Sequence, residues 1–227
     1  MERSPDVFSL ASGFLEGLAT PQREAVLAAG TLRQVRANSV VTHDGHAADH
    51  LFLLVKGRAR FFYITEEGQK LILLWLTPGE LFGARTLLLT PSTYLVSTET
   101  VKDSWVIGWN RSTIRGLALR YPRLLDNAIL VASDFLASQL GSYVALTTHN
   151  ARQRLVHVLT TLAPRIGREV SDGIELEVTN EELANAANVT LFTASRLLSE
   201  LQRKGAVLKR RGRVLLRSPE RLLSQVA

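Results

Sequence analysis

Apolar residues recur with two different periods along this chain of 227 residues. Between residues 31 and 110, short runs rich in Val, Leu, Ile and Phe are separated by glycine-containing turn signals at 43–45, 56–57, 66–68 and 77–79. Many short strands with glycine turns are typical of an antiparallel barrel or jelly roll. The pattern therefore predicts a β domain, with strands that include residues 50–57, 58–64 and 70–76.

From about Ile114 the spacing becomes that of a long helix. The pattern repeats at alternating intervals of four and three over three heptads, at Leu125, Ile129, Ala132, Leu136, Gln139, Tyr143 and Leu146. A second set offers another apolar face that can pack on the β domain, at Leu124, Ala128, Val131 and Phe135. We therefore expect the heptad seam to pair with the same helix of a second subunit. The alternative, a seam that lies against its own barrel, stays open at this level.

The last 77 residues, 151–227, show the signals of two short helices followed by a hairpin. Thr179 and Glu182 have the spacing of a capping box, which marks a helix start. Asn188 stands at a sharp turn, Thr190 is a favourable N-cap, and Gly205 ends the second helix. The predicted inward side chains are Leu183, Ala184, Ala187, Ala194, Leu197, Leu198 and Leu201. Two such helices describe a helix-turn-helix, and strand-like runs around Arg211-Gly212 predict a tight hairpin.

The exposed end of the second of these helices is a candidate for reading DNA bases. The predicted base-reading residues are Leu191, Phe192, Ser195 and Arg196. An arginine can bond guanine bidentately, and an apolar side chain can contact a thymine methyl group. The predicted phosphate contacts are Thr179, Thr190, Thr193, Ser199, Lys209, Arg210, Arg211 and Arg213. The alternative is that Phe192 packs under a neighbouring loop of its own domain.

Charge is spread unevenly, and this supports an anionic partner. Residues 1–150 hold 14 basic and 13 acidic side chains, whereas residues 151–227 hold 13 basic and 8 acidic ones. Within 203–221 there are eight basic residues and one acid, Glu220. A near-neutral body with a basic end favours a polyanion partner, although a solvated surface has the same composition.

The sequence lacks the signals that mark several other classes of protein. There are no cysteines, which excludes disulfides, thiolate chemistry and a cysteine-ligated iron–sulfur cluster. No unbroken run of about 18 apolar residues is present, and residues 1–10 do not resemble a secretory signal; the expectation is a cytoplasmic protein without a membrane span. We find no phosphate loop, metal-ligand set or nucleophile–base pair at motif spacing, so we do not expect an enzyme.

The order of these parts resembles the cyclic-AMP receptor protein/FNR (CRP/FNR) family of bacterial transcription regulators, from about residue 10 to 220. The resemblance is carried by residues 40–88, "VVTHDGHAADHLFLLVKGRARFFYITEEGQKLILLWLTPGELFGARTLL", by the long helix, and by residues 179–207, "TNEELANAANVTLFTASRLLSELQRKGAV". It implies an α+β chain with an N-terminal β jelly roll of the cyclic-nucleotide-binding type, a long dimerisation helix and a C-terminal winged helix-turn-helix. The corresponding ranges are 1–116, 117–150 and 151–227.

The resemblance also implies a function. Such a homodimer binds double-stranded DNA at a roughly palindromic site and regulates transcription through contacts with RNA polymerase. The base-reading pattern departs from the family, because cyclic-AMP-responsive members carry Arg-Glu where this chain has Leu191-Phe192. Arg196 is retained, and Ser195-Arg196 matches the FNR-like pair. Loss of the glutamate removes an acceptor for a cytosine amino group, which predicts a different half-site.

The effector pocket implied by the resemblance also departs from the cyclic-AMP pattern. It comprises Phe82, Gly83, Ala84, Arg85, Thr86, Tyr94, Leu95, Gln139 and Tyr143. Cyclic-AMP-binding members carry a glutamate for the ribose and an arginine for the phosphate at the positions of Ala84 and Tyr94. Arg85 is a possible substitute, and Gln139 stands where those members place a threonine on the adenine. We therefore expect an effector other than cyclic AMP, or none, and its identity is not encoded in a recognisable motif.

Two further alternatives bear on ligands and partners. Haem-binding members exist, and the chain offers His43, His46, His50, His149 and His157. Isolated surface histidines are the commoner arrangement, so we expect no metal or haem site. A small-molecule-binding module whose C-terminal domain docks a protein instead of DNA is the main competing function, and the basic hairpin argues against it.

Overall fold

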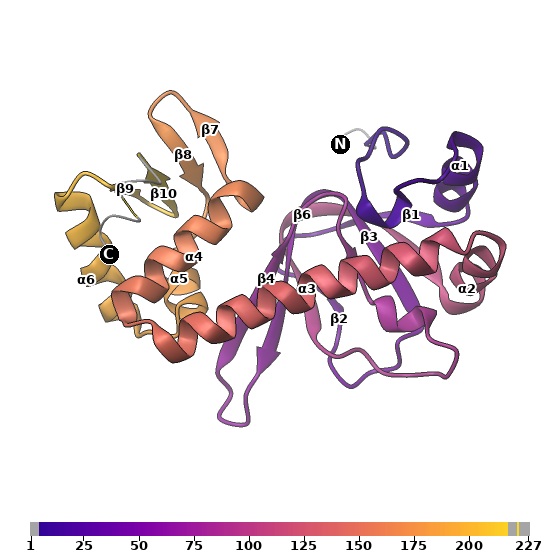
Figure 1. Ribbon diagram of the computed structural model, residues 1–227, viewed down its shortest axis with the longest axis horizontal. Helices are drawn as coiled ribbons and strands as arrows, with labels where there is room; N and C mark the ends of the chain where they lie inside the picture. Colours follow the sequence, from indigo (N-terminus) through magenta and orange to yellow (C-terminus); the bar gives the residue numbers. More distant parts are fainter. Residues whose placement is uncertain (1–4, 218–221, 223–227) are drawn as a thin grey trace. The chain divides into compact units, whose positions relative to one another are not determined.

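The computed structural model describes residues 5–217 and Leu222, and it divides into two compact units (Figure 1). The first comprises Met1–Tyr63 and Leu73–Ala137, and the second comprises Ile64–Ile72 and Ser138–Ala227. Of the basic residues noted in the sequence, Arg221 lies outside the described part of the chain, as does Glu220.

The first unit is built on an antiparallel sheet. The strands of this sheet are β1 (Thr31–Val35), β2 (Val40–Thr42), β3 (His50–Ile64), β4 (Lys70–Leu76), β5 (Leu81–Phe82) and β6 (Ser97–Asn110). The end of β3 and the start of β4, within Ile64–Ile72, are assigned to the second unit. Their order is β1-β6-β3-β4, with β2 paired to β6 and β5 paired to β3. The helical elements are a 3-10 turn at Gly13–Leu15, α1 (Thr20–Ala28), a second 3-10 turn at Ala84–Leu87, and α2 (Arg111–Arg120). The predicted β domain is thereby confirmed.

The predicted turn at Lys56-Gly57 is wrong, because β3 runs through it without reversing. Residues 50–57 and 58–64 are one strand, which pairs with β6 through register shifts between Leu54 and Ala59. Gly57 has φ +105°, and a Cβ there would lie 2.7 Å from the Cα of Ser104 on β6. Glycine is needed here because the backbone of β6 approaches closely at a bulge inside the sheet. The same residue type that marks turns elsewhere in the chain therefore marks a bulge at this position.

Both faces of β3 are buried. Leu51, Leu53 and Val55 point into one apolar cluster, and Phe52 and Leu54 point into another. Because successive side chains of a strand alternate between faces, burial on both sides explains the continuous apolar run "LFLLV" in place of an apolar–polar alternation.

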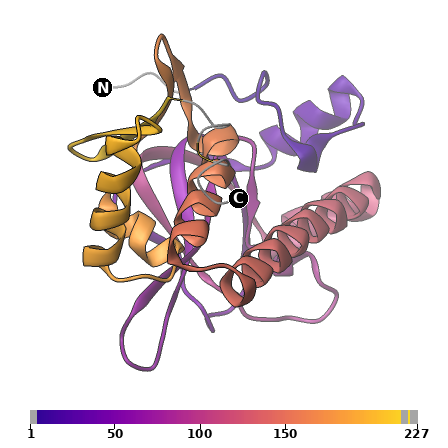
Figure 2. The ribbon, with the colours of Figure 1, turned by 60° about the vertical axis from the view of Figure 1, so that its left-hand side comes forward.

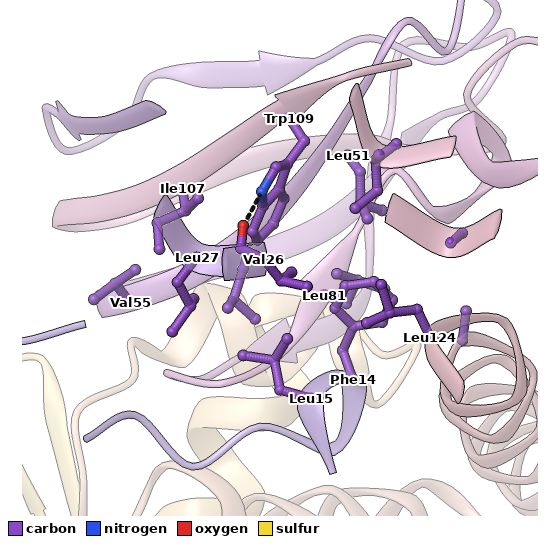
Figure 3. Close-up of a cluster of buried hydrophobic side chains, with 14 residues drawn as sticks. Phe14, Leu15, Val26, Leu27, Leu51, Val55, Leu81, Ile107, Trp109 and Leu124 are labelled. Carbon is purple, nitrogen blue, oxygen red and sulfur yellow. Dashed lines mark hydrogen bonds between the residues drawn. The ribbon is translucent and has the colours of Figure 1, made fainter. Parts of the chain in front are cut away.

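The first cluster attaches the N-terminal helical segment to the sheet (Figure 3). Phe14 and Val26 are completely buried, and the indole Nε1 of Trp109 donates a 2.8 Å hydrogen bond to the carbonyl of Val26. A buried indole N–H needs such a partner. This bond therefore joins α1 to β6 and satisfies the buried indole N–H of Trp109.

The long helix α3 (Arg123–Thr148) begins later than the predicted 117, since residues 117–120 complete α2. The break falls at Tyr121, whose φ of −128° and ψ of 80° are non-helical. The proline that follows, Pro122, disfavours helical geometry in the residue before it. Separate helices therefore flank this dipeptide.

One face of α3 packs on the first unit, as predicted from the second apolar set. Leu124 and Ala128 are buried, and the Phe135 ring meets Phe61 edge-on at 5.7 Å between centroids. The amide of Asn127 donates to the carbonyls of Phe14 and Glu16 at 2.9 and 2.8 Å. These contacts fix which face of the helix turns outward.

The outward face of α3 carries the predicted heptad seam. Eight large apolar side chains on this helix are exposed: Leu125, Ile129, Leu130, Leu136, Leu140, Tyr143, Val144 and Leu146. Gln139 is half-buried. The apolar face is thus wider than the seam alone, and exposed patches of this kind mark interaction sites.

By length and composition α3 is also long and apolar enough, over 18 residues, to cross a membrane. The sequence contains no unbroken apolar run of that length, because Asp126, Asn127 and Asp134 interrupt it. Asn127 and Leu124 are engaged with the first unit, so this helix also contributes to a protein core.

The second unit joins three helices to a small sheet (Figures 1 and 2). Its helices are α4 (Ala151–Ile166), α5 (Asn180–Ala186) and α6 (Leu191–Arg203). Its strands are β7 (Arg168–Val170), β8 (Gly173–Leu176), β9 (Val207–Arg210) and β10 (Arg213–Leu216), in the order β7-β8-β10-β9. The hairpin of β7 and β8 was not anticipated, although Asp172-Gly173 is a turn signal.

The helix-turn-helix details predicted from the sequence are confirmed. Thr179 and Glu182 form a reciprocal capping box, and the Thr190 hydroxyl caps α6 by accepting from the Thr193 N–H at 3.1 Å. Asn188 has φ +49° and Gly205 has φ +72°. All seven predicted inward side chains of α5 and α6 are buried, and the two helices pack side by side (Figures 1 and 2).

Candidate nucleic-acid interface and effector pocket

The first turn of α6 exposes two large apolar side chains. Leu191 is 54% and Phe192 79% exposed. The alternative of a Phe192 ring packed under a neighbouring loop is therefore wrong. The helix buries its opposite face, and these two neighbouring side chains form an exposed apolar patch of the kind that marks interaction sites.

The guanidinium group of Arg196 lies one turn further along α6 and is held by a carboxylate. Its Nη1 donates to Oε1 of Glu200 at 2.9 Å. The other carboxylate oxygen of Glu200 is ion-paired with Arg152 of α4. Glu200 is the less exposed partner, with a side-chain exposure of 18% against 56% for Arg196. The guanidinium group of Arg196 is therefore oriented by the carboxylate of Glu200, which is itself anchored to α4 through Arg152.

Arg154 of α4 holds the turn between α5 and α6. Its Nε donates to the carbonyl of Ala187 at 2.9 Å, and its Nη2 donates to that of Asn188 at 3.2 Å. Its Nη1 reaches the carbonyl of His149, just beyond α3, at 2.9 Å. One side chain therefore donates to three backbone carbonyl groups that receive no hydrogen bond from a helix or a sheet.

The predicted phosphate-contacting hydroxyls are already used in local structure. Thr179 and Thr190 are N-caps, and the Thr190 hydroxyl also donates to Oγ1 of Thr193 at 2.9 Å. The hydroxyl of Ser199 donates to the carbonyl of Ser195. Nζ of Lys209 lies 3.4 Å from this same hydroxyl oxygen of Ser199. The caps hold the ends of α5 and α6 in place, and Lys209 brings the hairpin to the exposed side of α6.

The hairpin of β9 and β10 turns at Arg211-Gly212, as predicted, with Gly212 at φ +68°. Arg211 is exposed at this turn. Arg210 and Arg213 lie on opposite strands, and both face Glu175 of β8, at 3.8 and 3.2 Å. Arg168 of β7 donates to the same carboxylate at 2.8 Å. This hydrogen bond, aided by the charges of the arginines, lowers the pKa of Glu175 below its ordinary value.

The sequence did not reveal five residues of this interface: Arg152, Arg154, Arg168, and the two carboxylates that pair with arginines, Glu175 and Glu200. The spacing of Arg196 and Glu200, four residues apart on one helix, was a usable signal. The partners of Glu175 come from three different strands, so no spacing along the chain reveals them.

Part of the predicted effector set gathers around the backbone of His50. Phe82 and Thr86 are buried, and Gly83, at φ +80°, leads into the 3-10 turn that carries Ala84 and Arg85. The Thr86 hydroxyl donates to the carbonyl of His50 at 2.8 Å. Leu95, by contrast, is 66% exposed. Gln139 and Tyr143 lie in the portion of α3 that belongs to the second unit, so their membership of this pocket stays a prediction.

Tyr94, predicted to stand where cyclic-AMP-binding proteins carry a phosphate-binding arginine, is itself engaged in hydrogen bonds. Its hydroxyl donates to the carbonyl of His50 at 2.9 Å and accepts from the N–H of His50 at 3.2 Å. Burial is the main cause of a raised pKa for this phenol. The side chain is therefore neutral at physiological pH and supplies no positive charge.

A cavity of about 500 Å³ opens beside Tyr94. It is lined by Arg33, Val41, Thr42, His43, His46, Ala47, Asp49, His50, Phe52 and Tyr94. The His43 and His46 rings lie 5.1 Å apart, and Nδ1 of His50 lies 2.8 Å from Asp49. In the part of the chain that the structure describes, no three His, Cys, Asp or Glu side chains are arranged to hold a metal ion.

Comparison with known proteins places both units in one family. Residues 32–121 match the cyclic nucleotide-binding domain, and residues 153–224 match the Crp-like helix-turn-helix domain. The cyclic AMP receptor protein of Thermus thermophilus is 29% identical over 216 residues, covering 95% of this chain and 97% of that protein. The chain belongs to the CRP/FNR family of transcription regulators.

Other relatives of this CRP/FNR regulator agree in sequence or in fold. The anaerobic regulatory protein of Bacillus subtilis is 23% identical over 199 residues, covering 86% of this chain and 84% of that protein. FixK2 from Bradyrhizobium japonicum superposes with a TM-score of 0.76 at 20% identity, covering 87% of this chain and 98% of the other. The c-di-GMP-responsive regulator CLP from Xanthomonas campestris gives 0.78 at 21% identity, covering 88% and 100%. The two solved structures show the shared fold.

The family confirms the predicted fold class, a mixed chain with an N-terminal β domain, a long helix and a C-terminal helix-turn-helix. It also confirms the function class: this CRP/FNR regulator is a DNA-binding transcription regulator with an effector-binding type of domain. The relatives named above are regulators of transcription.

Proposed function

We propose that this chain acts as a homodimer that binds a roughly palindromic site in double-stranded DNA and regulates transcription through RNA polymerase. The observation that best supports DNA binding is the exposed start of α6, where Leu191 and Phe192 precede Arg196, whose guanidinium group is oriented by Glu200. In helix-turn-helix proteins this end of the second helix touches base edges in the major groove. The basic hairpin is then placed to follow the phosphates. We infer a cytoplasmic binding protein with no catalytic step.

The proposed division of labour follows the order of the chain. Residues 1–116 sense an effector, the helical region within 117–150 joins two subunits, and residues 151–227 bind DNA. The apolar outer face of α3 supports the dimer, because water-exposed leucines at heptad spacing are stabilised by a matching helix. A two-fold dimer presents two α6 helices, which is why its site should be roughly palindromic.

We further propose that the effector is not cyclic AMP. Ala84 offers no acceptor for a ribose hydroxyl, and the neutral Tyr94 offers no charge for a phosphate. Arg85 is half-buried on the short helical turn and is the available substitute. A phosphate buried without a charged partner is strongly disfavoured.

Genomic footprinting followed by binding assays on the recovered site tests the DNA-binding part of the proposal. The expected result is a protected, roughly palindromic sequence that binds more tightly than random DNA. The affinity should fall linearly with salt on logarithmic axes, because phosphate contacts release counterions. A purified chain that binds no DNA at low salt would instead favour the competing function, docking of a protein by the C-terminal domain.

A further inference from the structure

Four charged side chains share one face of the sheet in the second unit. Arg168 lies opposite Glu175 across β7 and β8, and Glu175 lies opposite Leu215 across β8 and β10. Arg213, two residues from Leu215, points to the same side, and Arg210 lies directly opposite Arg213 on β9. The four strands therefore bring three guanidinium groups to a single carboxylate.

Burial separates the carboxylate from the arginines. The side chain of Glu175 is 8% exposed, whereas those of Arg168, Arg210 and Arg213 are 71%, 58% and 47% exposed. Like charges directly opposite one another destabilise a sheet, so Arg210 and Arg213 need the counter-charge behind them. The three cations and one anion retain a net charge of +2 on the solvent side.

The guanidinium groups keep capacity for a second anion. Each carries five N–H donors in a planar fork, and a single carboxylate cannot accept from all of them. The exposed fractions show that their outer sides reach solvent. Clustered arginines with this geometry match the oxygens of a phosphate group.

We propose that Arg168, Arg210 and Arg213 form one binding site for a backbone phosphate of DNA, with Glu175 as the positioning residue that holds the three guanidinium groups together. The proposal rests on the proposed function, since the ligand is DNA. It adds Arg168, from the hairpin of β7 and β8, to the predicted phosphate contacts. It also gives Glu175, an acid in a DNA-binding unit, a favourable role.

The first test uses Arg168→Gln, with Arg120→Gln as the control. Arg120 belongs to α2 in the first unit, and its guanidinium lies over the Tyr121 ring at 5.4 Å, so the control removes the same charge away from this site. Affinity for a short duplex of random sequence is measured by fluorescence anisotropy at several salt concentrations. We expect Arg168→Gln to weaken binding about three- to tenfold and to reduce the salt slope by about one, with little change for the control. A slope equal to that of the wild type would overturn the proposal.

The second test compares Glu175→Gln with Glu169→Gln. Glu169 is exposed on β7 and lies next to Arg168 in the chain, so both variants remove one negative charge from the same hairpin. Simple electrostatics predicts tighter DNA binding for both. Positioning predicts that Glu175→Gln binds about three- to tenfold more weakly, with a smaller salt slope, while Glu169→Gln binds equally or more tightly. A Glu175→Gln variant that gains affinity as Glu169→Gln does would overturn the role of Glu175.

Stability and function are separated by further measurements. Thermal unfolding reports whether Glu175→Gln is folded, and Glu175→Asp, which keeps the charge, should recover part of the affinity. If Glu175→Gln does not fold, the salt slope of Arg168→Gln decides, because that side chain is largely exposed. A wild-type chain that binds no duplex contradicts the proposed function itself, whereas wild-type binding with an unchanged Arg168→Gln slope contradicts only this inference.

Discussion

At the scale of single residues, the exposed end of α6 combines two kinds of recognition. Arg196 can give a directional, bidentate contact to guanine, while Phe192 and Leu191 can give only apolar contact to a thymine methyl. Arg196 is pre-oriented by Glu200, which lowers the conformational entropy lost on binding. The two contacts should therefore differ in both affinity and selectivity.

We expect Arg196→Ala to cost about 1–3 kcal/mol on the footprinted site and to relax preference at one base pair. Phe192→Ala should cost less but should lower discrimination at a neighbouring thymine. Titrations on single-base variants of the site, at two salt concentrations, distinguish the two. A uniform loss for every variant with Arg196→Ala, accompanied only by a changed salt slope, would show a phosphate clamp, and specificity would then come from DNA bending.

The effector pocket gives a second prediction at this scale. With Ala84 and the engaged, neutral Tyr94 in the two recognition positions, cyclic AMP should bind no more tightly than about millimolar, equivalent to about −4 kcal/mol. Isothermal titration calorimetry measures this directly. Micromolar affinity would contradict the prediction and would point to Arg85 as the phosphate ligand. The Arg85→Gln variant should then lose this affinity for cyclic AMP.

At the scale of elements, α3 has two faces with different roles. Its buried face is fixed by Leu124, Ala128 and Asn127, and this leaves Leu136, 59% exposed, on the other side. An exposed leucine tolerates a polar replacement in a monomer, whereas the same replacement in a helix pair buries an unpaired charge. Leu136 therefore reports on dimerisation with little effect on the fold of one chain.

We expect Leu136→Asp to convert the proposed dimer into folded monomers, as measured by analytical ultracentrifugation. Ser133→Asp is a useful control, because Ser133 is exposed on the same helix and lies outside the predicted seam. It should leave the dimer intact. If Leu136→Asp remains dimeric at the concentration where the wild type dimerises, the seam assignment is wrong.

At the scale of the whole molecule, stability should depend on pH through His157. Its ring lies edge-on to His149 at 6.1 Å between centroids, and burial, followed by the charge of His149, lowers its pKa. The unfolded chain then binds a proton more readily than the folded chain. The stability that His157 contributes is complete above its unfolded pKa of about 6.5 and declines as the pH falls below that value.

Thermal unfolding at pH 7.5 and pH 5.5 tests this coupling. We expect the midpoint to fall further for the wild type than for His157→Gln, which lacks the titrating ring. His46→Gln, a change of an exposed histidine, should behave as the wild type does. An identical pH response in wild type and His157→Gln would contradict the prediction.

Local patterns determined most of the fold and much of the candidate interface. The capping box at Thr179, the turn at Asn188 and the exposed first turn of α6 follow from residues a few positions apart, because helix caps and faces are set by short-range geometry. The two faces of α3 follow from its periodicity for the same reason. The glycine at position 57 shows the limit, since its chain neighbours do not reveal that Ser104 approaches it from another strand.

Only the tertiary structure decided which charges stand together. Arg168, Glu175, Arg210 and Arg213 are up to 45 positions apart in the numbering, and they meet because β8 pairs with β7 on one side and β10 on the other. Arg154 reaches Ala187 and Asn188 in the same way, across the packing of α4 on α5. Sequence determines periodicity and caps because these depend on neighbours along the chain, whereas ion pairs depend on distances that strand pairing and helix packing set.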